Sequence, residues 1–326
     1  MTVYVLSPDN NKPSGGIKIL YRHVDVLNRN GIDAAVLHQT PGFRCSWFEN
    51  ATRVAYLQST RLIDTDFLVI PEIYGPNITG MSDMPMIGSK VKKIIFNQNC
   101  RYTFLGQTTE TVMQQDFDLA YTHNDEFPGA IVVSEDSKQY LEYVFPGLQV
   151  WRIHNAINVD QFSFSSQKKK QICFMPRKHA EDALQVLGIL NLRDVLGDFK
   201  VVAIENRSEA EVAEIMRESM FFLSFGYPEG CPLPPAEAMA CGCVVIGYDG
   251  FGGREYFDTE FSYPIQIGDM VGFADTVEKL IRLSAAEPDK IGRKAEKASE
   301  FVRQTYSPSR EQEDILAIWH SLLSVV

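Results

Sequence analysis

Two glutamates, Glu229 and Glu237, stand eight positions apart around a turn rich in glycine and proline. Proline suits the first turn of a helix, because its missing N–H would have no helical partner there. A helix that begins at Pro234 or Pro235 is therefore expected. Glu229 then lies in the loop and Glu237 in the first turns of the helix, so that both carboxylates can face one pocket.

The elements around this pair predict a ligand site. The apolar strand 221–223 runs into the loop, and ligands of open α/β sheets bind beyond the carboxyl ends of such strands. The helix start adds N–H donors and a positive dipole end, which suit a phosphate group.

The segment from Glu229 to Glu237, with the run 238–246 and Gly252-Gly253-Arg254-Glu255 behind it, resembles the retaining GT-B glycosyltransferases of the family 4 (group 1) type. The E-x7-E motif of that family lies in the nucleotide-sugar site. The resemblance implies that Glu229 reaches the hydroxyls of the donor sugar and that Glu237 holds the ribose diol. It covers about thirty contiguous residues with ordered Gly, Pro and Glu, which makes it more specific than a short pattern.

Strand and helix patterns alternate along the chain, which is typical of a parallel, doubly wound sheet. Short apolar runs predict strands at 3–7, 33–37, 66–70, 93–96, 118–121, 130–133, 171–174, 200–203, 220–224 and 243–247. Amphipathic patterns predict helices at 17–30, 136–144, 178–190, 209–218, 235–241, 275–284, 290–306 and 309–323.

The predicted fold class is α/β, with two Rossmann-like lobes facing a central cleft (GT-B). Residues 150–162 resemble the N-G-[IV]-D-x-x-x-F junction of these transferases, with Ala156 in place of the usual Gly. The resemblance implies an acceptor-side domain at 1–160, a nucleotide-sugar donor domain at 161–306, and a C-terminal helix at 307–326 that crosses back to the first lobe. The polar run 163–170 is interpreted as a hinge or surface link.

Departure of a nucleoside diphosphate requires stabilisation of its growing negative charge. Arg177 and Lys178 are the candidate cations, because they follow a strand and lie at a helix start, where a cation is locally unfavourable. The family usually spaces its Arg and Lys about five positions apart, whereas here the two are adjacent. Together with Glu229 they form the predicted catalytic set.

The donor-binding set contains Glu237 and the loop residues Gly230, Cys231 and Leu233, whose amides the family uses to hold the donor sugar. The common form of this loop is E-G-[FY]-G-L, and Pro232 departs from it by lacking an N–H. A different choice of sugar is therefore possible.

Gly15 and Gly16 complete the donor set by resemblance, since a Gly pair there brings the backbone close to the donor phosphates or the acceptor. A simple helix N-terminus is the alternative interpretation of the pair. The turn before it is too long for a G-x-G-x-x-G dinucleotide fingerprint, and the chain has no P-loop motif.

Acceptor recognition is expected in the first lobe. Asn97, Asn99 and Arg101 follow a predicted strand and offer amides and a cation, and His123 follows another. Amide clusters also make turns, and a single loop histidine is often structural, so both interpretations stay open.

Composition narrows the class of partner. A chain of 326 residues with 45% hydrophobic side chains can form two domains, and its net charge of −11 argues against nucleic acid and against more than peripheral membrane association. The N-terminus lacks a signal-peptide pattern and no run spans a bilayer, so a cytoplasmic location is expected. The oligomeric state is left open.

No metal or cofactor is expected. The six cysteines lack C-x-x-C spacing, and a zinc site at Cys231, Cys241 and Cys243 has no accompanying histidine. No D-x-D motif is positioned as metal-dependent GT-A transferases require.

The sequence thus predicts a metal-independent retaining hexosyltransferase that uses a nucleoside-diphosphate sugar and a glycan, lipid-linked or small-molecule acceptor. A glycoside hydrolase is disfavoured, because its two carboxylates must flank one bond from opposed walls. Two alternatives remain: a nucleotide-sugar epimerase on the same fold, and a non-catalytic subunit that binds sugar nucleotide or a partner. Pro232 and the adjacent cations keep the second alternative open.

Overall fold

A computed structural model of the protein describes residues 1–80, 86–88, 90–115 and 118–324. The chain divides into two compact units. Unit 1 contains residues 1–153 and 311–326, and unit 2 contains residues 154–310. Each unit has its own parallel sheet, so the α/β prediction is confirmed.

Unit 1 is built on a seven-stranded parallel sheet with the order β3-β2-β1-β4-β5-β6-β7. Its strands are β1 (Val3–Leu6), β2 (Ala34–His38), β3 (Val54–Tyr56), β4 (Phe67–Pro71), β5 (Lys92–Asn97), β6 (Gly129–Val132) and β7 (Gln149–Arg152). All residues of β1, β2, β4 and β6 are buried, because helices and loops cover both faces of the sheet. Their apolar sequences are the reason that they form central strands.

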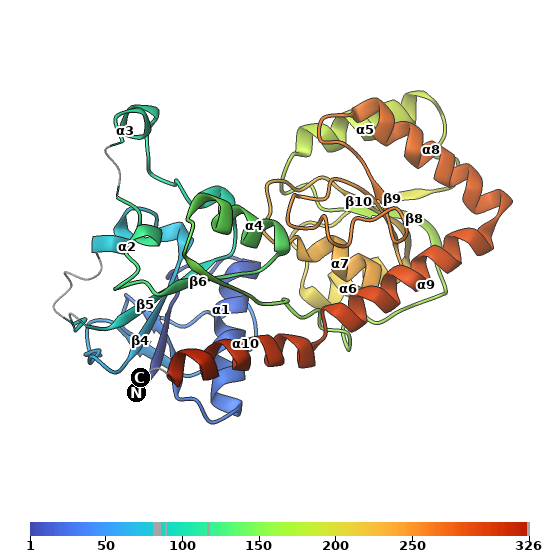
Figure 1. The fold of residues 1–326 in the computed structure, drawn as a ribbon. Coiled ribbons are helices and arrows are strands. Elements are labelled where there is room, and N and C mark those ends of the chain that lie inside the picture. The colour runs from blue at the N-terminus through green and yellow to red at the C-terminus, as the bar shows by residue number, and fades with distance from the viewer. Residues whose placement is uncertain (81–85, 89, 116–117, 325–326) are drawn as a thin grey trace. The chain divides into compact units, whose positions relative to one another are not determined.

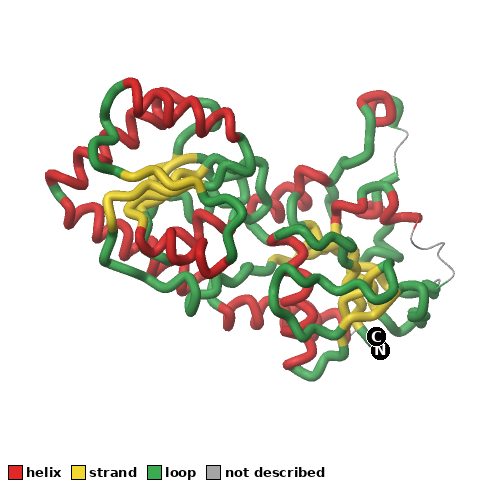
Figure 2. The backbone as a smooth tube through the Cα atoms, turned by 180° about the vertical axis from the view of Figure 1, so that it is seen from behind, coloured by secondary structure: helices red, strands yellow, loops and turns green. Residues whose placement is uncertain are grey.

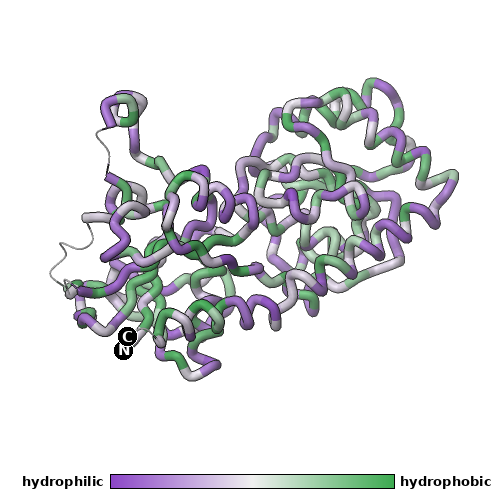
Figure 3. The backbone as a smooth tube through the Cα atoms, viewed as in Figure 1, coloured by the Kyte–Doolittle hydropathy of each residue, from purple (hydrophilic) through white to green (hydrophobic). Residues whose placement is uncertain are grey.

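Helical segments surround this sheet, as the red segments in Figure 2 show. They are α1 (Gly15–Arg29), α2 (Asn77–Gly80), α3 (Thr109–Met113), α4 (Glu135–Val144), the 311–323 part of α10 (Pro308–Leu323), and the 3-10 turns η1 (Glu72–Tyr74), η3 (Cys100–Tyr102) and η4 (Ala120–Thr122). Figure 3 shows that hydrophobic residues concentrate in the strands, whereas the long helices alternate between polar and apolar positions. This alternation buries one stripe of each helix.

The C-terminal helix α10 packs on α1 in unit 1 (Figure 1). The indole Nε1 of Trp319 donates to His23 Nε2 over 2.8 Å, and both side chains are buried. Arg22 of α1 donates to the nearly buried Glu311 over 2.7 Å. These contacts join residues almost three hundred positions apart in the chain, and the predicted return of the last helix to the first lobe is confirmed.

Unit 2 contains a five-stranded parallel sheet with the order β12-β11-β10-β8-β9. The strands are β8 (Lys169–Phe174), β9 (Lys200–Ala203), β10 (Ser219–Ser224), β11 (Val244–Gly247) and β12 (Tyr263–Pro264). The helices are α5 (Ala180–Leu192), α6 (Glu209–Glu218), α7 (Leu233–Ala240), α8 (Met270–Ala286) and α9 (Pro288–Thr305). A separate apolar cluster covers each face of this sheet. Within the described residues, the structure contains no helix of the length and hydropathy that a membrane crossing requires.

The polar run 163–170 packs against unit 2 through Lys168. Its ammonium donates to the carbonyls of Met216 and Arg217 at the end of α6 and of Cys241 at the end of α7, over 3.3, 3.0 and 2.8 Å. Carbonyls at helix C-termini lack intrahelical partners and carry partial negative charge, so one cation stabilises two helix ends. This segment therefore holds helices together within one unit.

The strand prediction at 118–121 is wrong. Residues 120–122 form the 3-10 turn η4, in which the amide of Thr122 donates to Leu119 O over 2.9 Å. Strand β5 already has β4 and β6 on its two sides, so no sheet edge is available there for another strand. The strands β3, β7 and β12 were not predicted, because they are edge strands with few buried residues and lack an apolar run.

Acid is expected to destabilise the protein through His23. Burial lowers the pKa of His23 from 6.5 to about 3 in the folded chain, so only the unfolded state gains the proton between these values. Stability should therefore fall as pH falls through this window, by about 5 kcal/mol in total. Urea unfolding at several pH values measures this loss, which His23→Gln should reduce and a control at the exposed His320, His320→Gln, should not. An equal pH dependence in wild type and His23→Gln would contradict the assignment.

Lys168→Met is expected to destabilise unit 2 by about 1–3 kcal/mol, because helix-end carbonyls lose their donor. Lys170→Met is the matched control, since Lys170 and its partner Asp198 are 56% and 73% exposed and such pairs contribute little. Thermal unfolding of the two variants makes the comparison. An equal loss of stability in the two variants would show that the hydrogen bonds from Lys168 to the helix-end carbonyls do not stabilise unit 2.

Candidate functional site

An ion pair joins the loops that follow two neighbouring strands of unit 2. Lys178, after β8, places its Nζ 2.8 Å from Oε1 of Glu229, after β10. The same ammonium lies 3.4 Å from the carbonyl oxygen of Pro228. The side chains of Lys178 and Glu229 are 30% and 26% exposed, so solvent and a ligand can reach both. A cation and a carboxylate are thus held together at the carboxyl edge of the sheet.

The backbone of Glu229 is fixed by the loop that follows β11. Its amide donates to Gly250 O over 2.8 Å, and its carbonyl accepts from the amide of Gly252 over 3.1 Å. The two backbones approach so closely that a Cβ on Gly252 would lie 1.9 Å from the carbonyl oxygen of Gly230. Only glycine fits at 252, and the Glu229 carboxylate therefore stands on a rigid base.

His179 and Tyr227 support the ion pair from the adjacent positions. Their rings stack with centroids 3.8 Å apart and planes 4° apart, and His179 Nε2 donates to Tyr227 O over 2.6 Å. His179 has a φ of 54°, in the left-handed region, and precedes the first residue of α5. The stacked rings join the loop of Lys178 to the loop of Glu229.

The remaining donor-set residues lie along the same loop. Gly230 is buried, Cys231 is partly exposed, and Leu233 is the first residue of α7. Glu237 is half-buried within α7, and no side chain caps the start of this helix. The carbonyl of Pro232 accepts from the hydroxyl of the buried Tyr256, which fixes the turn.

The two adjacent cations lie in different surroundings. Arg177 is exposed in the turn after β8, whereas Lys178 contacts Glu229. The sequence analysis assigned both residues the same role, the stabilisation of the departing diphosphate. In the structure, the turn after β8 brings Lys178 to Glu229 and leaves Arg177 exposed.

Gly15 and Gly16 form the start of α1 in unit 1, where Ser14 makes no side-chain cap. The side chain of Gln98, after β5, donates to Gly16 O over 3.2 Å. A Cβ on Gly16 would lie 3.2 Å from Gln98 Oε1, so a larger residue would crowd this contact. The predicted glycine turn and the predicted amide loop are therefore neighbours.

The acceptor-side candidates after β5 differ in exposure. Asn97 is fully buried and donates to the hydroxyl of Tyr121 over 2.6 Å. Asn99 is 6% exposed and accepts from the amide of Arg101 over 3.1 Å. The exposed Arg101 lies 4.0 Å from Asp136, with its guanidinium 5.8 Å from the ring centre of Tyr140. Of these three residues, Arg101 has the greatest access to solvent.

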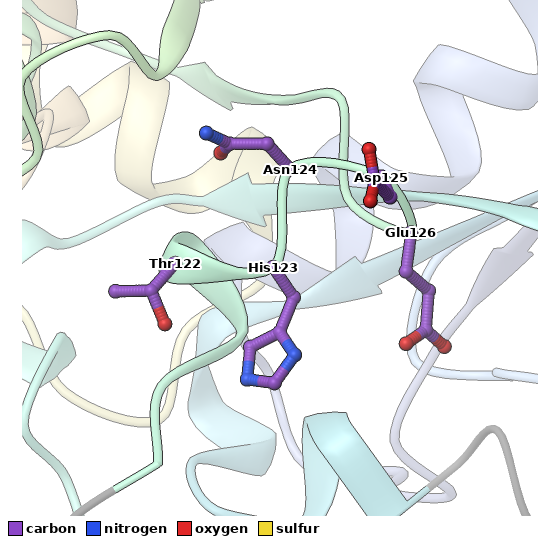
Figure 4. A pocket seen from close by; sticks show the side chains of 5 residues that line it. All are labelled: Thr122, His123, Asn124, Asp125 and Glu126. Atoms are coloured by element: carbon purple, nitrogen blue, oxygen red, sulfur yellow. The ribbon is translucent and has the colours of Figure 1, made fainter.

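His123 lies in a different part of unit 1, in a pocket lined by residues 122–126 (Figure 4). The five side chains in this view point in different directions rather than toward one centre. His123 itself pairs with the exposed Asp118. The structure gives no contact between His123 and the loop that holds Asn97 and Asn99 in the described part of unit 1.

Sequence reasoning missed three polar groups at the carboxyl edge of the unit 1 sheet. His38, at the end of β2, shares hydrogen bonds of 2.7 Å with the Tyr21 hydroxyl and 2.8 Å with Asp9. Burial lowers the pKa of His38, although its contact with Asp9 acts to raise it. Burial acts to raise the pKa of Asp9, but hydrogen bonds from Thr40 and His38 outweigh it and lower the pKa.

The third missed group is Glu72, directly after β4, with 3% of its surface exposed. Burial raises its pKa from 4.5 to about 7, and nearby backbone N–H groups of Gln98, Glu72 and Asn99 act in the opposite direction. The available signal was its position: a carboxylate immediately after a predicted apolar strand.

Residues 198–298 match the family model described as glycosyl transferases group 1. The chain is 27% identical over 269 residues to an alpha-1,6-glucosyltransferase of Actinobacillus pleuropneumoniae serotype 7 (strain AP76), covering 80% of this chain and 76% of the relative.

Two solved structures share the fold over nearly the whole chain. Sucrose-phosphate synthase from Thermosynechococcus elongatus superposes with a TM-score of 0.74 at 14% identity, covering 100% of both chains. Anabaena HepE in complex with UDP and glucose superposes with a TM-score of 0.68 at 13% identity, covering 98% of this chain and 100% of that one. The fold is therefore GT-B, as predicted, and residues 198–298 resemble the group 1 glycosyltransferases.

Proposed function

We propose that the protein is a retaining GT-B glycosyltransferase of the group 1 type. It moves a hexosyl group from a nucleoside-diphosphate sugar to a hydroxyl of a glycan, lipid-linked or small-molecule acceptor. The observation that carries this proposal is the Lys178–Glu229 ion pair, held by backbone contacts at the carboxyl edge of the unit 2 sheet. Glu229 also lies within the segment that matches the family model.

The ion pair supplies the two charges that the donor half of the reaction needs. In the proposed reaction, Lys178 and Arg177 stabilise the charge that develops on the departing diphosphate. Glu229 accepts hydrogen bonds from the sugar hydroxyls. At the start of α7 the N–H of Leu233 can bind a phosphate, whereas Pro232, Pro234 and Pro235 have no N–H. Glu237, one turn further, binds the ribose diol.

The configuration at the anomeric carbon is retained in this reaction, because the acceptor hydroxyl attacks from the face that the diphosphate leaves. The departing phosphate takes the proton of that hydroxyl. No dedicated base is needed in this mechanism, and protein cations replace a metal ion. The proposal therefore includes metal independence, which an assay in the presence and absence of EDTA tests directly.

UDP-glucose is the first donor to test. A relative at 27% identity is an alpha-1,6-glucosyltransferase, and a protein with the same fold was solved in complex with UDP-glucose. Both facts belong to those proteins, and they favour a glucosyl donor for this chain. Pro232, which removes one amide from the donor loop, favours testing other sugars as well.

Two alternatives predict different results in the same assays. A non-catalytic subunit would bind sugar nucleotide or a partner without turnover, and an epimerase would change the sugar without an acceptor. The partly exposed Lys178–Glu229 pair would serve a binder as well as a transferase, so turnover in the presence of an acceptor distinguishes the two.

Nucleotide binding is expected to stabilise the protein against heat. A ligand at about 100 times its Kd adds roughly 2.7 kcal/mol to the free energy of unfolding. We expect this from UDP or another single nucleoside diphosphate, tested beside GDP, ADP, dTDP and their sugars. Glu237→Ala should reduce the effect of the nucleotide, whereas Glu229→Ala should remove only the extra effect of the sugar. No stabilisation by any of them would contradict a donor site.

Glu229→Ala is expected to lower kcat/KM for sugar transfer at least about 100-fold, which corresponds to about 2.7 kcal/mol of transition-state stabilisation. The free energy of unfolding should change by no more than about 1 kcal/mol, because the ion pair is partly exposed. Glu218→Gln is the control, since it breaks the exposed Lys169–Glu218 pair of the same unit. A Glu229→Ala protein with wild-type turnover would rule out the proposed role.

A further inference from the structure

Phe251 has a backbone conformation that bulky residues rarely adopt. Its φ is 75°, in the left-handed region, where a residue with a Cβ is strained. Asn, Asp and His tolerate this region better than other side chains, and only glycine adopts it freely. The other non-glycine residues with a positive φ in the described part of the chain are Gln115, His179, Asp194 and Asn206. Phenylalanine at 251 therefore keeps a backbone cost that a glycine would remove.

Glycines surround Phe251 in the loop after β11. Gly250 has a φ of 68°, and a Cβ on it would lie 3.1 Å from the Cβ of Glu229. A Cβ on Gly253 would lie 2.4 Å from a backbone oxygen, and one on Gly252 would lie 1.9 Å from another. Phe251 is the one member of this run with a side chain. A strained residue that persists among glycines points to a use for its side chain.

The backbone of Phe251 lies beside that of Glu229. The two residues form an isolated parallel bridge. The amide of Glu229 donates to Gly250 O over 2.8 Å, and its carbonyl accepts from the amide of Gly252 over 3.1 Å. Both flanking residues of Phe251 are therefore bonded to Glu229, and the aromatic residue is fixed next to the carboxylate that is proposed to bind the donor sugar.

The ring of Phe251 extends a row of aromatic rings next to the ion pair. His179 stacks on Tyr227 with centroids 3.8 Å apart, and the ring of Tyr227 lies 6.3 Å from that of Phe251 with the planes 80° apart. His179 follows Lys178 in the chain, and Tyr227 precedes Glu229 by two positions. All three aromatic residues are partly exposed. An apolar surface that a ligand can reach therefore borders the charged pair.

Arg254 holds the ring of Phe251 from another side. Its guanidinium carbon lies 5.1 Å from the ring centre, and its Nε lies 3.6 Å from Oδ2 of Asp249. A cation over an aromatic face is attracted by the ring quadrupole. The surroundings of the ring, rather than the preference of its own backbone, therefore determine where it lies.

A hexose presents two kinds of surface to a protein. Its hydroxyl groups form hydrogen bonds, and the C–H groups on the faces of its ring pack against the electron-rich face of an aromatic side chain. Binding sites for small molecules combine apolar or aromatic walls with a few polar groups that fix the orientation of the ligand. Glu229 supplies such a polar group here, and Phe251 supplies an aromatic wall beside it.

We propose that Phe251 is a specificity-determining residue of the donor site: its ring packs against the apolar face of the transferred hexose while Glu229 binds the hydroxyls of the same sugar. The inference rests on the proposed function for the donor, and it assigns a sugar contact to a residue outside the segment from Glu229 to Glu237. The nucleotide does not contact this ring, so only the binding of the sugar depends on it.

Calorimetric titration with UDP and with UDP-glucose tests the sugar contact. In Phe251→Ala the Kd for UDP-glucose should rise about tenfold and the Kd for UDP should not change, because one aromatic contact is lost. Phe251→Tyr, which keeps the ring, should bind both ligands as the wild type does. An equal loss for the two ligands would assign the ring to the nucleotide and overturn the proposal, as would an unchanged Kd for UDP-glucose. A wild type that binds neither these ligands nor another nucleoside diphosphate would refute the proposed function as well.

Kinetics separate a sugar contact from a distorted loop. Phe251→Ala should raise the KM for UDP-glucose about tenfold and leave kcat and the acceptor KM unchanged, because binding is lost equally in the ground state and the transition state. Phe251→Tyr should restore the wild-type KM. A lower kcat with an unchanged KM would show that the substitution displaces Glu229, and it would overturn the proposed contact.

Stability tests whether the backbone at Phe251 is strained. Phe251→Gly should unfold about 3 °C above Phe251→Ala, because only glycine adopts a positive φ without cost. Alanine is the more stable of the two at an ordinary position. Asp194, with a φ of 53° in an exposed turn after α5, is the matched control: Asp194→Gly should also unfold above Asp194→Ala, with no change in the KM for UDP-glucose. A Phe251→Ala protein as stable as Phe251→Gly would overturn the claim that a strained residue is kept for its ring.

Discussion

The close approach between the backbone at 229–230 and the backbone at 250–252 determines the candidate site of unit 2. Two hydrogen bonds join these segments, and the absence of a side chain at Gly252 makes the approach possible. Because the loop after β10 is pinned to the loop after β11, the Glu229 carboxylate has one position from which it meets Lys178. The loop itself contains two glycines and two prolines, and this contact fixes its central part around Glu229.

The two units use the edge of a parallel sheet in different ways. In unit 2 the edge carries a partly exposed pair of opposite charges, which a phosphate or a sugar hydroxyl can approach. In unit 1 the edge carries the buried side chains of Glu72, Asn97 and His38, and His38 pairs with the partly exposed Asp9. Exposed charges suit a ligand that brings its own charge, whereas buried ones are better suited to hold loops in place.

Buried polar contacts between distant segments also hold each unit together. Trp319 donates to a neutral His23 and joins the last helix to the first, and Lys168 joins the ends of α6 and α7. In each case a helix end or an indole N–H that would otherwise lose its partner on burial gains one. The polar appearance of residues 163–170 in the sequence conceals this role, because a lysine that binds carbonyls and a lysine in solvent look the same there.

Local sequence patterns predicted some elements correctly and failed for others. Periodic apolar spacing was enough to predict α1, α6 and the central strands, because the burial of one helix stripe or of a whole strand shows directly in the local sequence. Segment 118–121 has the composition of a strand but became a 3-10 turn, since β5 had both neighbours already. Similarly, short strands at the sheet edges depend on pairing more than on their own sequence.

The sequence by itself determined the α/β class through its periodicity and the resemblance through the ordered motif around Glu229 and Glu237. The return of the last helix was expected only because that resemblance implies it. Only the tertiary structure decided that Lys178 rather than Arg177 meets Glu229, and that Asn97 and Glu72 are buried. The physical reason is that a side chain's partner and its loss of water are set by segments far away in the chain. The sequence pattern of a strand shows where the following loop begins. The contacts of that loop depend on its neighbours in space, as the close approach at Gly252 shows for the loop of Glu229.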